Sequence, residues 1–435
     1  MMKKHLLSVV ALLLSISAIG FEITIDQGLD KLTRMAVVPF QVEGNAVDVS
    51  STITNDLRSS GQFEMIRPEH MLSLPTTPDE ISYRDWRILE TEYVVVGKSR
   101  VNDFGQLEVD FHVVEVNTER LIKSTRVTGA VELFVDVSHA ISDSIFEHLT
   151  GTQSIFSTKV VYVLAIGRAT QNPIFKLIKS DWDGGRQETL LETSQPLLSP
   201  NWSPDGRSVA YVSFEAGGSA IHVMNLDTRK VEVLASFEGV NSAPVYSPDG
   251  SQMAMTLSRS GNPEIYLMDM EERTLRQITD HHAIDTESSW AYDGESLLFT
   301  SDRSGSVQIY EVELDTLLTK RVTNHGAYNA RPRMLPDNDH LVFVHRIDRV
   351  YHIAWQRIGG VTGPRILSSK VLDESPSISP NGAMLLYSTK ENERGILAMV
   401  SVDGRIALRL PSTEGSVQEP AWSPFLPSFI NLEDI

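Results

Sequence analysis

Five acidic side chains in the second half of the chain are of the type that binds metal ions. They are Asp285, Glu287, Asp373, Glu374 and Glu419. A calcium ion takes six to eight oxygen ligands, and carboxylates are its usual ligands in proteins. If these side chains converge they could attract one calcium ion. No other pattern in the sequence requires a cofactor, and we otherwise expect none.

Patterns that support catalysis are missing from the sequence. The 435 residues include no cysteine, which excludes thiol catalysis, cysteine-ligated zinc and disulfides. No G-x-S-x-G, no H-E-x-x-H and no P-loop occurs. His281 and His282 could suggest a metal site, but they are adjacent and lack a third convergent ligand, so we expect both to face solvent. We therefore predict that the protein is not an enzyme.

A turn motif recurs six times in the second part of the chain. In sequence order its copies are Ser203-Pro204-Asp205-Gly206, Ser247-Pro248-Asp249-Gly250, Ala291-Tyr292-Asp293-Gly294, Leu335-Pro336-Asp337-Asn338, Ser379-Pro380-Asn381-Gly382 and Ser423-Pro424-Phe425-Leu426. Consecutive copies are always 44 residues apart. Proline followed by Asp-Gly favours a tight turn between antiparallel strands, and about 44 residues is the size of one propeller blade. These repeats predict a six-bladed β-propeller, in which Gln418 to Trp422 supplies the innermost strand of the first blade.

The residues that begin the innermost strand of each blade should ring one mouth of the propeller channel. Aligned by the 44-residue period, they are Ser199, Ala243, Glu287, Arg331, Ser375 and Glu419, preceded by Leu198, Ser242, Thr286, Ala330, Glu374 and Gln418. Recognition residues concentrate at loops that a rigid scaffold holds in place. We interpret this ring as a surface for docking another protein; the alternative is that these side chains only solvate the opening.

An α/β domain precedes the propeller. Residues 35–40 read as a buried strand, and the segments Glu92 to Val101, Leu107 to Val116 and Arg120 to Thr128 read as three further strands. Apolar residues at helical spacing predict one helix before Gly61, another after Pro78 and a last one ending near Gly151. We assign residues 34–157 to this domain and residues 158–430 to the propeller.

The first twenty residues have the pattern of a secretory signal peptide. Lys3 and Lys4 precede an apolar run from Leu6 to Ile16, and small residues lead up to Gly20. That run is shorter than the roughly 20 residues needed to span a bilayer, so we expect cleavage and no stable membrane insertion. Lys and Arg number 38 against 57 Asp and Glu, which argues against nucleic-acid binding. The mature chain is expected to be exported and monomeric.

Over most of its length the chain resembles the TolB family of the Gram-negative Tol-Pal system. The resemblance is carried by Ile25-Asp26-Gln27-Gly28, Val37-Val38-Pro39-Phe40, Asp56-Leu57-Arg58-Ser59-Ser60-Gly61, Val94-Val95-Val96-Gly97, Phe146-Glu147-His148-Leu149-Thr150-Gly151 and the six turn motifs. It implies a periplasmic adaptor that binds the lipoprotein Pal through the propeller mouth and TolA through its N-terminal segment. Such an adaptor maintains outer-membrane integrity and supports invagination of that membrane during cell division.

The resemblance also points to particular residues. It assigns Pal contacts to Ala243 and Thr286, with Asn241 and Glu287 beside them, whereas Val240 and Ser288 depart from the family pattern. The TolA-binding strand maps within residues 21–33 onto Glu22, Ile23, Thr24, Ile25, Asp26, Gln27, Gly28, Leu29 and Asp30. Its first residues alternate polar and apolar as a strand that adds to a partner's sheet would. The same segment could instead be the first strand of the α/β domain.

Two other classes of protein remain as alternatives. Some hydrolases carry a propeller beside a catalytic domain, but about 120 residues without a nucleophile motif would have to supply that domain. A glycan-binding or metal-binding propeller would need exposed aromatic platforms or convergent ligands at the mouth, where Tyr328 is the aromatic residue.

Overall fold

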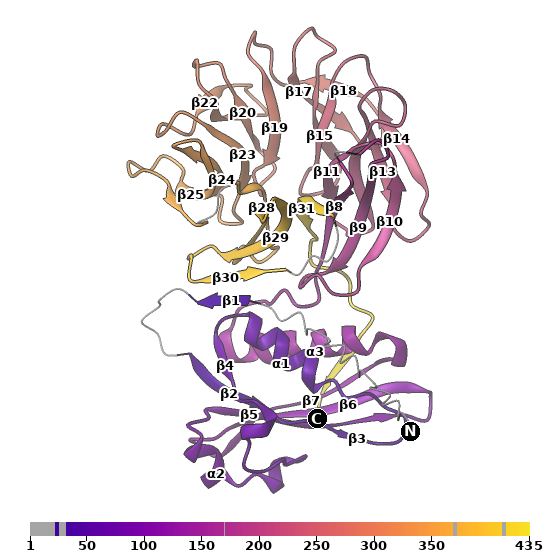
Figure 1. The fold of residues 1–435 in the computed structure, drawn as a ribbon, viewed down its shortest axis with the longest axis vertical. Coiled ribbons are helices and arrows are strands. Elements are labelled where there is room, and N and C mark those ends of the chain that lie inside the picture. The colour runs from indigo at the N-terminus through magenta and orange to yellow at the C-terminus, as the bar shows by residue number, and fades with distance from the viewer. Residues whose placement is uncertain (1–21, 26–31, 169, 369–371, 411–414) are drawn as a thin grey trace, which may run out of the picture.

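The computed structural model describes residues 22–25, 32–168, 170–368, 372–410 and 415–435. It consists of an α/β domain followed by a six-bladed β-propeller, which confirms the predicted fold class (Figure 1). The predicted signal peptide over residues 1–20 lies outside the described residues. Residues 26–30 of the predicted TolA-binding strand also lie outside them.

The α/β domain is built on one mixed sheet with the order β32-β7-β6-β5-β2-β4 and with β3 paired to β5. Its elements are β2 (Thr33–Val37), β3 (Gln41–Val42), α1 (Ser50–Ser59), β4 (Phe63–Met65), α2 (Tyr83–Ile88), β5 (Tyr93–Val101), β6 (Gln106–Glu115), β7 (Arg120–Ala130), α3 (Phe134–Thr150) and β32 (Asn431–Asp434). Short 3-10 turns occupy Pro68–His70, Pro78–Glu80 and Val131–Leu133. The helix expected after Pro78 is therefore a 3-10 turn followed by α2.

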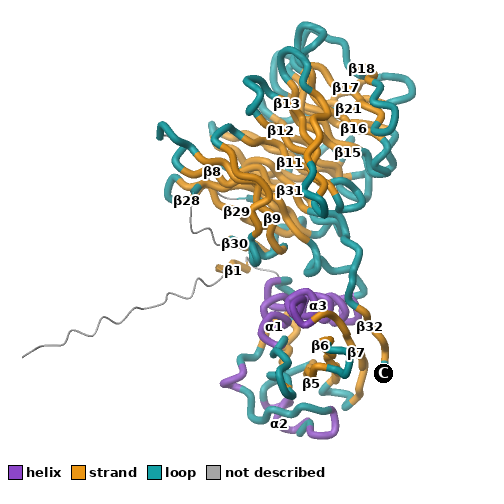
Figure 2. Tube along the Cα trace, turned by 90° about the vertical axis from the view of Figure 1, so that its right-hand side faces the viewer, coloured by secondary structure: helices purple, strands orange, loops and turns teal. Residues whose placement is uncertain are grey.

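Helices α1 and α3 lie between this sheet and the propeller (Figure 2). Ile53 and Leu57 of α1 and Ile141 and Ile145 of α3 are fully buried, as their helical spacing predicts. Helix α3 ends at Gly151, whose φ of 70° is the left-handed conformation that favours glycine at a helix C-terminus.

The six blades follow one another along the chain as four-stranded antiparallel sheets. From the innermost strand outward, the first blade is β31 (Ser416–Trp422), β8 (Lys159–Ile166), β9 (Ile174–Asp181) and β10 (Glu188–Thr193), and the second is β11 (Leu197–Trp202), β12 (Ser208–Ser213), β13 (Ala220–Asn225) and β14 (Val231–Ala235). The third blade is β15 (Asn241–Tyr246), β16 (Gln252–Leu257), β17 (Glu264–Asp269) and β18 (Leu275–Gln277), and the fourth is β19 (Asp285–Trp290), β20 (Ser296–Ser301), β21 (Gln308–Glu313) and β22 (Thr319–Arg321). The fifth blade is β23 (Asn329–Met334), β24 (His340–Ile347), β25 (Val350–Arg357) and β26 (Arg365–Ile366), and the sixth is β27 (Glu374–Ile378), β28 (Met384–Glu391), β29 (Arg394–Ser401) and β30 (Ile406–Arg409).

The turn motif joins the two inner strands of a blade. In the first copy the Ser203 hydroxyl donates to Asp205 Oδ1 at 2.6 Å, and the Arg207 amide donates to the same oxygen at 3.0 Å. Gly206 takes a φ of 71°, which explains the glycine at the end of the motif. Side-chain hydrogen bonds of this kind pair with backbone groups of the turn that have no partner in the neighbouring strand.

Strand β31 closes the ring by pairing with β8. Gln418 lies opposite Val163, and Trp422 lies opposite Val160, so the last inner strand of the chain completes the first blade. The indole of Trp202 also donates to the Ala421 carbonyl at 3.1 Å, across to the next inner strand. The predicted closure by residues 418–422 is therefore confirmed.

Each end of the described chain pairs with the sheet of the other domain. Strand β1 (Glu22–Ile25) pairs antiparallel with β30 and becomes the fifth strand of the last blade (Figure 1). Strand β32 leaves the propeller and pairs antiparallel with β7 at the edge of the α/β sheet. The N-terminal strand thus adds to the propeller, and the alternative that it begins the α/β sheet is wrong.

The two domains share one buried apolar cluster. Phe146 of α3 packs edge-on against Phe156, at 5.6 Å between ring centroids, and Phe156 lies 5.4 Å from the ring of Trp182 in the propeller. The cluster continues into the last blade through Met399 and Leu408. Because this core is continuous, the structure presents the two domains as one packed body.

Buried charges join the domains beside this core. His139 of α3 contacts Asp56 of α1 at 2.8 Å through Nδ1 and lies 3.7 Å from Asp181 of β9 through Nε2. Burial alone would lower the pKa of His139, but these two carboxylates outweigh it and raise the pKa to about 10. Lys159 and Arg186 each contact Asp181 at 2.6 Å and also reach Asp136 of α3, at 3.1 and 2.5 Å, so the charges in this cluster are paired across the interface.

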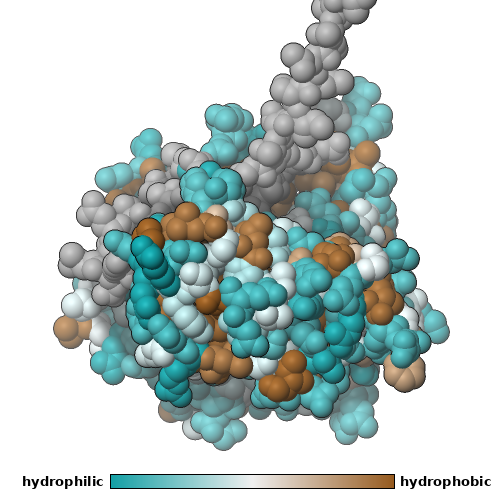
Figure 3. Space-filling view, turned by 90° about the horizontal axis from the view of Figure 1, so that it is seen from below, coloured by the Kyte–Doolittle hydropathy of each residue, from teal (hydrophilic) through white to brown (hydrophobic). Residues whose placement is uncertain are grey.

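The outer face of the α/β domain shows no single large apolar patch in the view from below. Hydrophobic residues there form separate groups among hydrophilic ones (Figure 3). Within the described ranges, no helix has both the length and the apolar character needed to cross a bilayer.

Candidate functional site

Six residues with left-handed backbone conformation ring one end of the propeller channel. They are Ser199, Ala243, Glu287, Arg331, Ser375 and Glu419, with φ values between 48° and 55°. None is glycine, and each lies where the register between the two inner strands of its blade shifts. A non-glycine residue in this conformation costs of order 1 kcal/mol, so the fold sustains the same backbone strain six times at one mouth.

Arg331 joins the strands around this mouth. Its Nε donates to Glu287 Oε1 at 2.7 Å, and its Nη2 donates to Glu419 Oε1 at 3.3 Å. Its Nη1 donates to the hydroxyl of Ser375. Glu419 in turn accepts from the backbone amide of Ser199 at 2.6 Å. One guanidinium group thus links β19, β23, β27 and β31, and the chain of bonds reaches β11.

The carboxylates hold Arg331 in its charged form. Burial disfavours the guanidinium charge, but Glu287 and Glu419 outweigh that effect and raise the pKa of Arg331 above its usual range. Arg333 lies two residues along the same strand and lines the same opening. Burial lowers the pKa of Arg333, and its Nη1 donates to the Pro332 carbonyl at 2.8 Å.

The strand β15 side of the mouth is not held by this network. All six left-handed residues line one small cavity of about 60 Å³, together with Pro244 and Ser288. Ala243 is the ring member without a polar side chain, and it is half-buried. The cavity is therefore bounded by charged side chains on one side and by Ala243 and its neighbours on the other.

The remaining predicted mouth residues divide into half-buried and fully buried positions. Leu198, Ser242, Thr286, Glu374 and Gln418 are half-buried beside the ring. Asn241 and Ala330 are 0% and 2% exposed. The Asn241 amide donates to the carbonyls of Ser219 and Phe237, at 2.9 and 2.6 Å, so this residue holds the preceding loop in place.

Exposed apolar side chains lie on the loops around the mouth. Val240 and Ile284 precede the inner strands β15 and β19, and Ile347 ends β24 at the same side of the blades; they are 39%, 50% and 41% exposed. Tyr328 packs edge-on against Tyr351 at 5.4 Å, under the guanidinium of Arg346. The motif alignment did not select the three aliphatic residues, because they lie outside the strands it aligned. Exposed apolar groups around a polar centre suit protein docking.

Three of the five acidic residues considered for calcium are paired with arginine side chains. Asp285 is fully buried, and its Oδ2 accepts from Arg303 at 2.5 Å; burial raises the pKa of Asp285. Asp373 is also fully buried, while Glu287 and Glu419 are paired with Arg331. Across the described ranges, no three or more histidine and acidic side chains are grouped so that they could hold a metal ion. His281 and His282 stack on each other at 4.2 Å.

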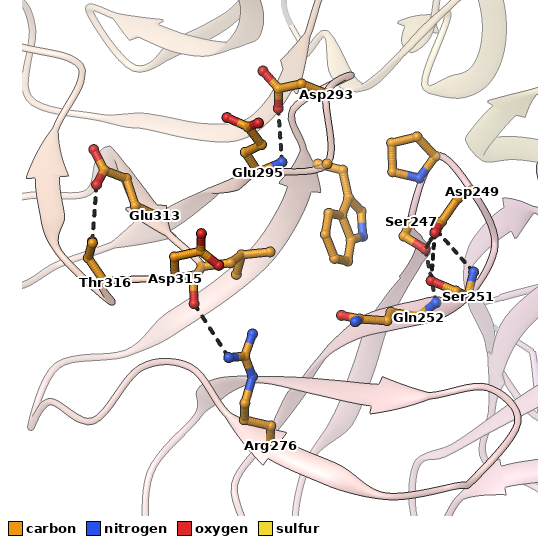
Figure 4. A pocket seen from close by; sticks show the side chains of 14 residues that line it. Ser247, Asp249, Ser251, Gln252, Arg276, Asp293, Glu295, Glu313, Asp315 and Thr316 are labelled. Carbon is orange, nitrogen blue, oxygen red and sulfur yellow. Dashed lines mark hydrogen bonds between the residues drawn. The ribbon is translucent and has the colours of Figure 1, made fainter.

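A larger cavity of about 570 Å³ lies at the turn end of the blades, between the turns that follow β15 and β19 (Figure 4). Acidic side chains line it: Asp249, Asp293, Glu295, Glu313 and Asp315. Arg276 lies among them and donates from Nη1 to the Leu314 carbonyl at 3.4 Å. Trp290 lines it too, but its side chain is buried at 7% exposure and its indole donates to the Val245 carbonyl. This cavity therefore lacks the exposed aromatic platform that glycan binding favours.

In the part of the chain that the structure describes, the α/β domain leaves the mouth uncovered. It contacts the opposite end of the blades, where the Asn381 amide of a turn motif donates to the Gln153 carbonyl at 2.8 Å. The inner strand β27 runs from Ser375 at the mouth to this turn. The ring and the interdomain contact therefore lie at opposite ends of the propeller.

These features define a β-propeller protein with an N-terminal α/β domain and an open, polar channel mouth. A family model described as the TolB amino-terminal domain matches residues 21–122, and one described as the TolB beta propeller domain matches residues 146–426. The chain belongs to the TolB family.

Individual relatives agree with this assignment over nearly the whole chain. A Tol-Pal system protein TolB of Pseudomonas entomophila is 55% identical over 411 residues, which cover 93% of this chain and 94% of the relative. The protein of the same name from Pseudomonas aeruginosa is 51% identical over the same share. The crystal structure of TolB from Acinetobacter baumannii superposes with a TM-score of 0.85 at 36% identity, covering 93% of this chain and all of that one. The two Pseudomonas relatives are named as proteins of the Tol-Pal system, and their names state no enzymatic activity.

Proposed function

We propose that this protein is a non-enzymatic periplasmic adaptor that binds the lipoprotein Pal at the propeller mouth. The observation that carries the proposal is the ring of six strained residues at an end of the channel that the α/β domain does not cover. Strained backbone persists where the surrounding structure enforces it, and it clusters at ligand-binding sites. The role of the adaptor is to keep the outer membrane intact and to couple it to cell division.

Pal binding is tested at the side of the ring that lacks charged contacts. Ala243 and Thr286 are half-buried, and the Thr286 hydroxyl lies 3.3 Å from that of Thr256. Adding methyl groups in Ala243→Val or Thr286→Ile should weaken binding of soluble Pal by about 1 to 3 kcal/mol, the usual cost of overpacking. Calorimetry would measure this loss, and unchanged affinity in both variants would move the Pal site elsewhere.

We further propose that TolA binds the N-terminal segment Glu22 to Asp30. Four of these residues form β1, which is held on the outer edge of the last blade by pairing with β30. A strand at a sheet edge can be exchanged for a partner's edge, because both offer the same backbone hydrogen bonds. The propeller and TolA would then compete for β1.

Coupling between the two partners follows if Pal favours the docked state of β1. By linkage, saturating Pal would weaken TolA binding by the same factor by which TolA weakens Pal binding, commonly 5- to 150-fold. Titration of TolA into the mature protein, with and without Pal, measures the factor. Deletion of residues 21–30 should abolish TolA binding and leave Pal binding in place. Equal TolA affinities in the two titrations would show that the sites are independent.

A further inference from the structure

One position in the mouth breaks the six-fold pattern of the blades. The residue after the left-handed ring residue is proline in five inner strands: Pro200, Pro244, Pro332, Pro376 and Pro420. In β19 the same position is Ser288. The neighbouring residue Glu287 has the same left-handed backbone as its five counterparts, so the substitution changes the side chain and not the local fold.

The Ser288 hydroxyl has no partner. The residue is 3% exposed, and its Oγ makes no hydrogen bond to any described residue. Leaving a buried hydroxyl unpaired costs about 1 to 3 kcal/mol. A proline at this position would carry no such cost, as the five other blades show.

Ser288 also retains a backbone N–H at a place where the other strands have none. Proline cannot donate a hydrogen bond, so the strand ladder of a blade does not need a donor at this position. Ser288 therefore gives the mouth two polar groups that the propeller fold does not require. Both belong to a residue that lines the mouth cavity beside Ala243 and Pro244.

The charges around Ser288 determine which group it could bind. The carboxylates of Glu287 and Glu419 lie at the same cavity, and the guanidinium of Arg331 is already bonded to both. Arg333 also lines this cavity, so two guanidinium groups stand beside two carboxylates and their formal charges cancel. A carboxylate or phosphate would find no net positive charge here to offset the loss of its hydration, whereas a neutral hydrogen-bond acceptor loses less on entering.

We propose that Ser288 is a specificity-determining contact for the protein partner at the mouth, and that it donates to a neutral acceptor on an inserted loop. The acceptor is a backbone carbonyl or a side-chain amide. A serine hydroxyl reorients by rotation about one side-chain bond, so an entering acceptor can bring it toward the cavity that Ser288 lines. This inference rests on the proposed binding of Pal at the mouth.

The test compares Ser288→Ala, Ser288→Pro and the control Ser289→Ala in the mature full-length chain. Ser289 is 6% exposed on the same strand but does not line the mouth cavity. The ligand is the soluble domain of Pal without its lipid anchor, titrated by calorimetry, and melting temperatures are measured by circular dichroism.

Ser288→Ala should bind Pal between about twofold and tenfold more weakly, the range expected for one hydrogen bond. Ser288→Pro, which removes the N–H as well, should lose at least as much. Neither should melt below the wild type, because each removes an unpaired buried hydroxyl.

Unchanged Pal affinity in both Ser288 variants would overturn the inference while leaving the Pal site itself in place. An equal loss of affinity in Ser289→Ala would also overturn it, because the effect would then reflect packing of the strand. Failure of the wild type to bind Pal would instead refute the proposed function, and this inference would fall with it.

Discussion

Replacing His139 by leucine should destabilise the protein more than any surface change on the same helix. Leucine fills a similar volume but leaves the carboxylates of Asp56 and Asp181 buried without the imidazolium between them. Asp181 keeps Lys159 and Arg186 at 2.6 Å each, whereas within the described residues the imidazole is the only ion-pair partner of the Asp56 side chain. The cost of leaving a carboxylate buried without a counter-charge therefore arises mainly at Asp56.

The magnitude follows from the pKa of His139, which rises from 6.5 to about 10 on folding. Each unit corresponds to about 1.4 kcal/mol, and about three of these units lie above pH 7, so the bound proton contributes about 4 kcal/mol at pH 7. This agrees with the roughly 3 to 5 kcal/mol lost when one partner of a buried ion pair is removed. It is a large share of the 5 to 15 kcal/mol by which proteins are usually stable.

The assay is urea unfolding followed by circular dichroism at pH 7 and at intervals up to pH 10.5. Because the folded pKa is raised, the contribution is complete below about pH 6.5 and disappears as the pH rises through about 10. Wild-type stability should therefore fall over this window, and His139→Leu should lack that component of the fall.

Two further variants make the measurement specific. His148→Leu changes an exposed histidine of α3 and should cost less than about 1 kcal/mol. The double variant Asp56→Leu with His139→Leu should recover most of the loss, because it removes the unpaired charge. A loss below about 1 kcal/mol in His139→Leu, or an unchanged pH profile, would refute the reasoning.

Three other predictions concern the propeller. Truncation after Pro411 removes β31, and β32 with it, so the protein should aggregate or lose its melting transition; a monomer with native melting in gel filtration and calorimetry would contradict the closure by β31. Arg331→Met should lower the free energy of unfolding by about 1 to 2 kcal/mol in urea titrations. The expected loss is this small because the Arg331 side chain is 29% exposed, and solvent weakens its ion pairs. A variant as stable as the wild type would show that the network contributes nothing to stability. Chelation with EDTA should leave the melting temperature unchanged, since Arg331 already supplies positive charge to Glu287 and Glu419; a fall reversed by calcium would establish a metal site.

Much of the fold could be predicted because the turn motif repeats without insertions. The constant spacing of 44 residues established the number of blades, and the position of the last motif near Trp422 indicated that a C-terminal strand closes the first blade. Strands β1 and β32 could not be placed in the same way. Both are short edge strands, and pairing of an edge strand depends on which unpaired edge the tertiary fold brings near it.

The mouth was located from the sequence, but its geometry was not. Left-handed backbone is usually signalled by glycine or asparagine, and the six ring positions hold serine, alanine, glutamate and arginine. The proline that follows five of them was no guide to this geometry either, because proline favours an extended backbone in the residue before it. The central role of Arg331 had no signal in the repeat, because its contacts join residues of four different blades.

Closure by β31 also sets the order of events during synthesis. Lys159, which begins β8, bonds through its backbone amide to Ser423, 264 residues later in the chain. At about 5 to 20 residues per second, the inner edge of β8 exists for about 13 to 50 seconds before the strand that covers it has been made. For that interval the first blade has an unpaired inner edge and an open apolar face. A newly made chain that awaits export is therefore expected to need holding chaperones at least until its last twenty residues have been made, because the propeller cannot close before then.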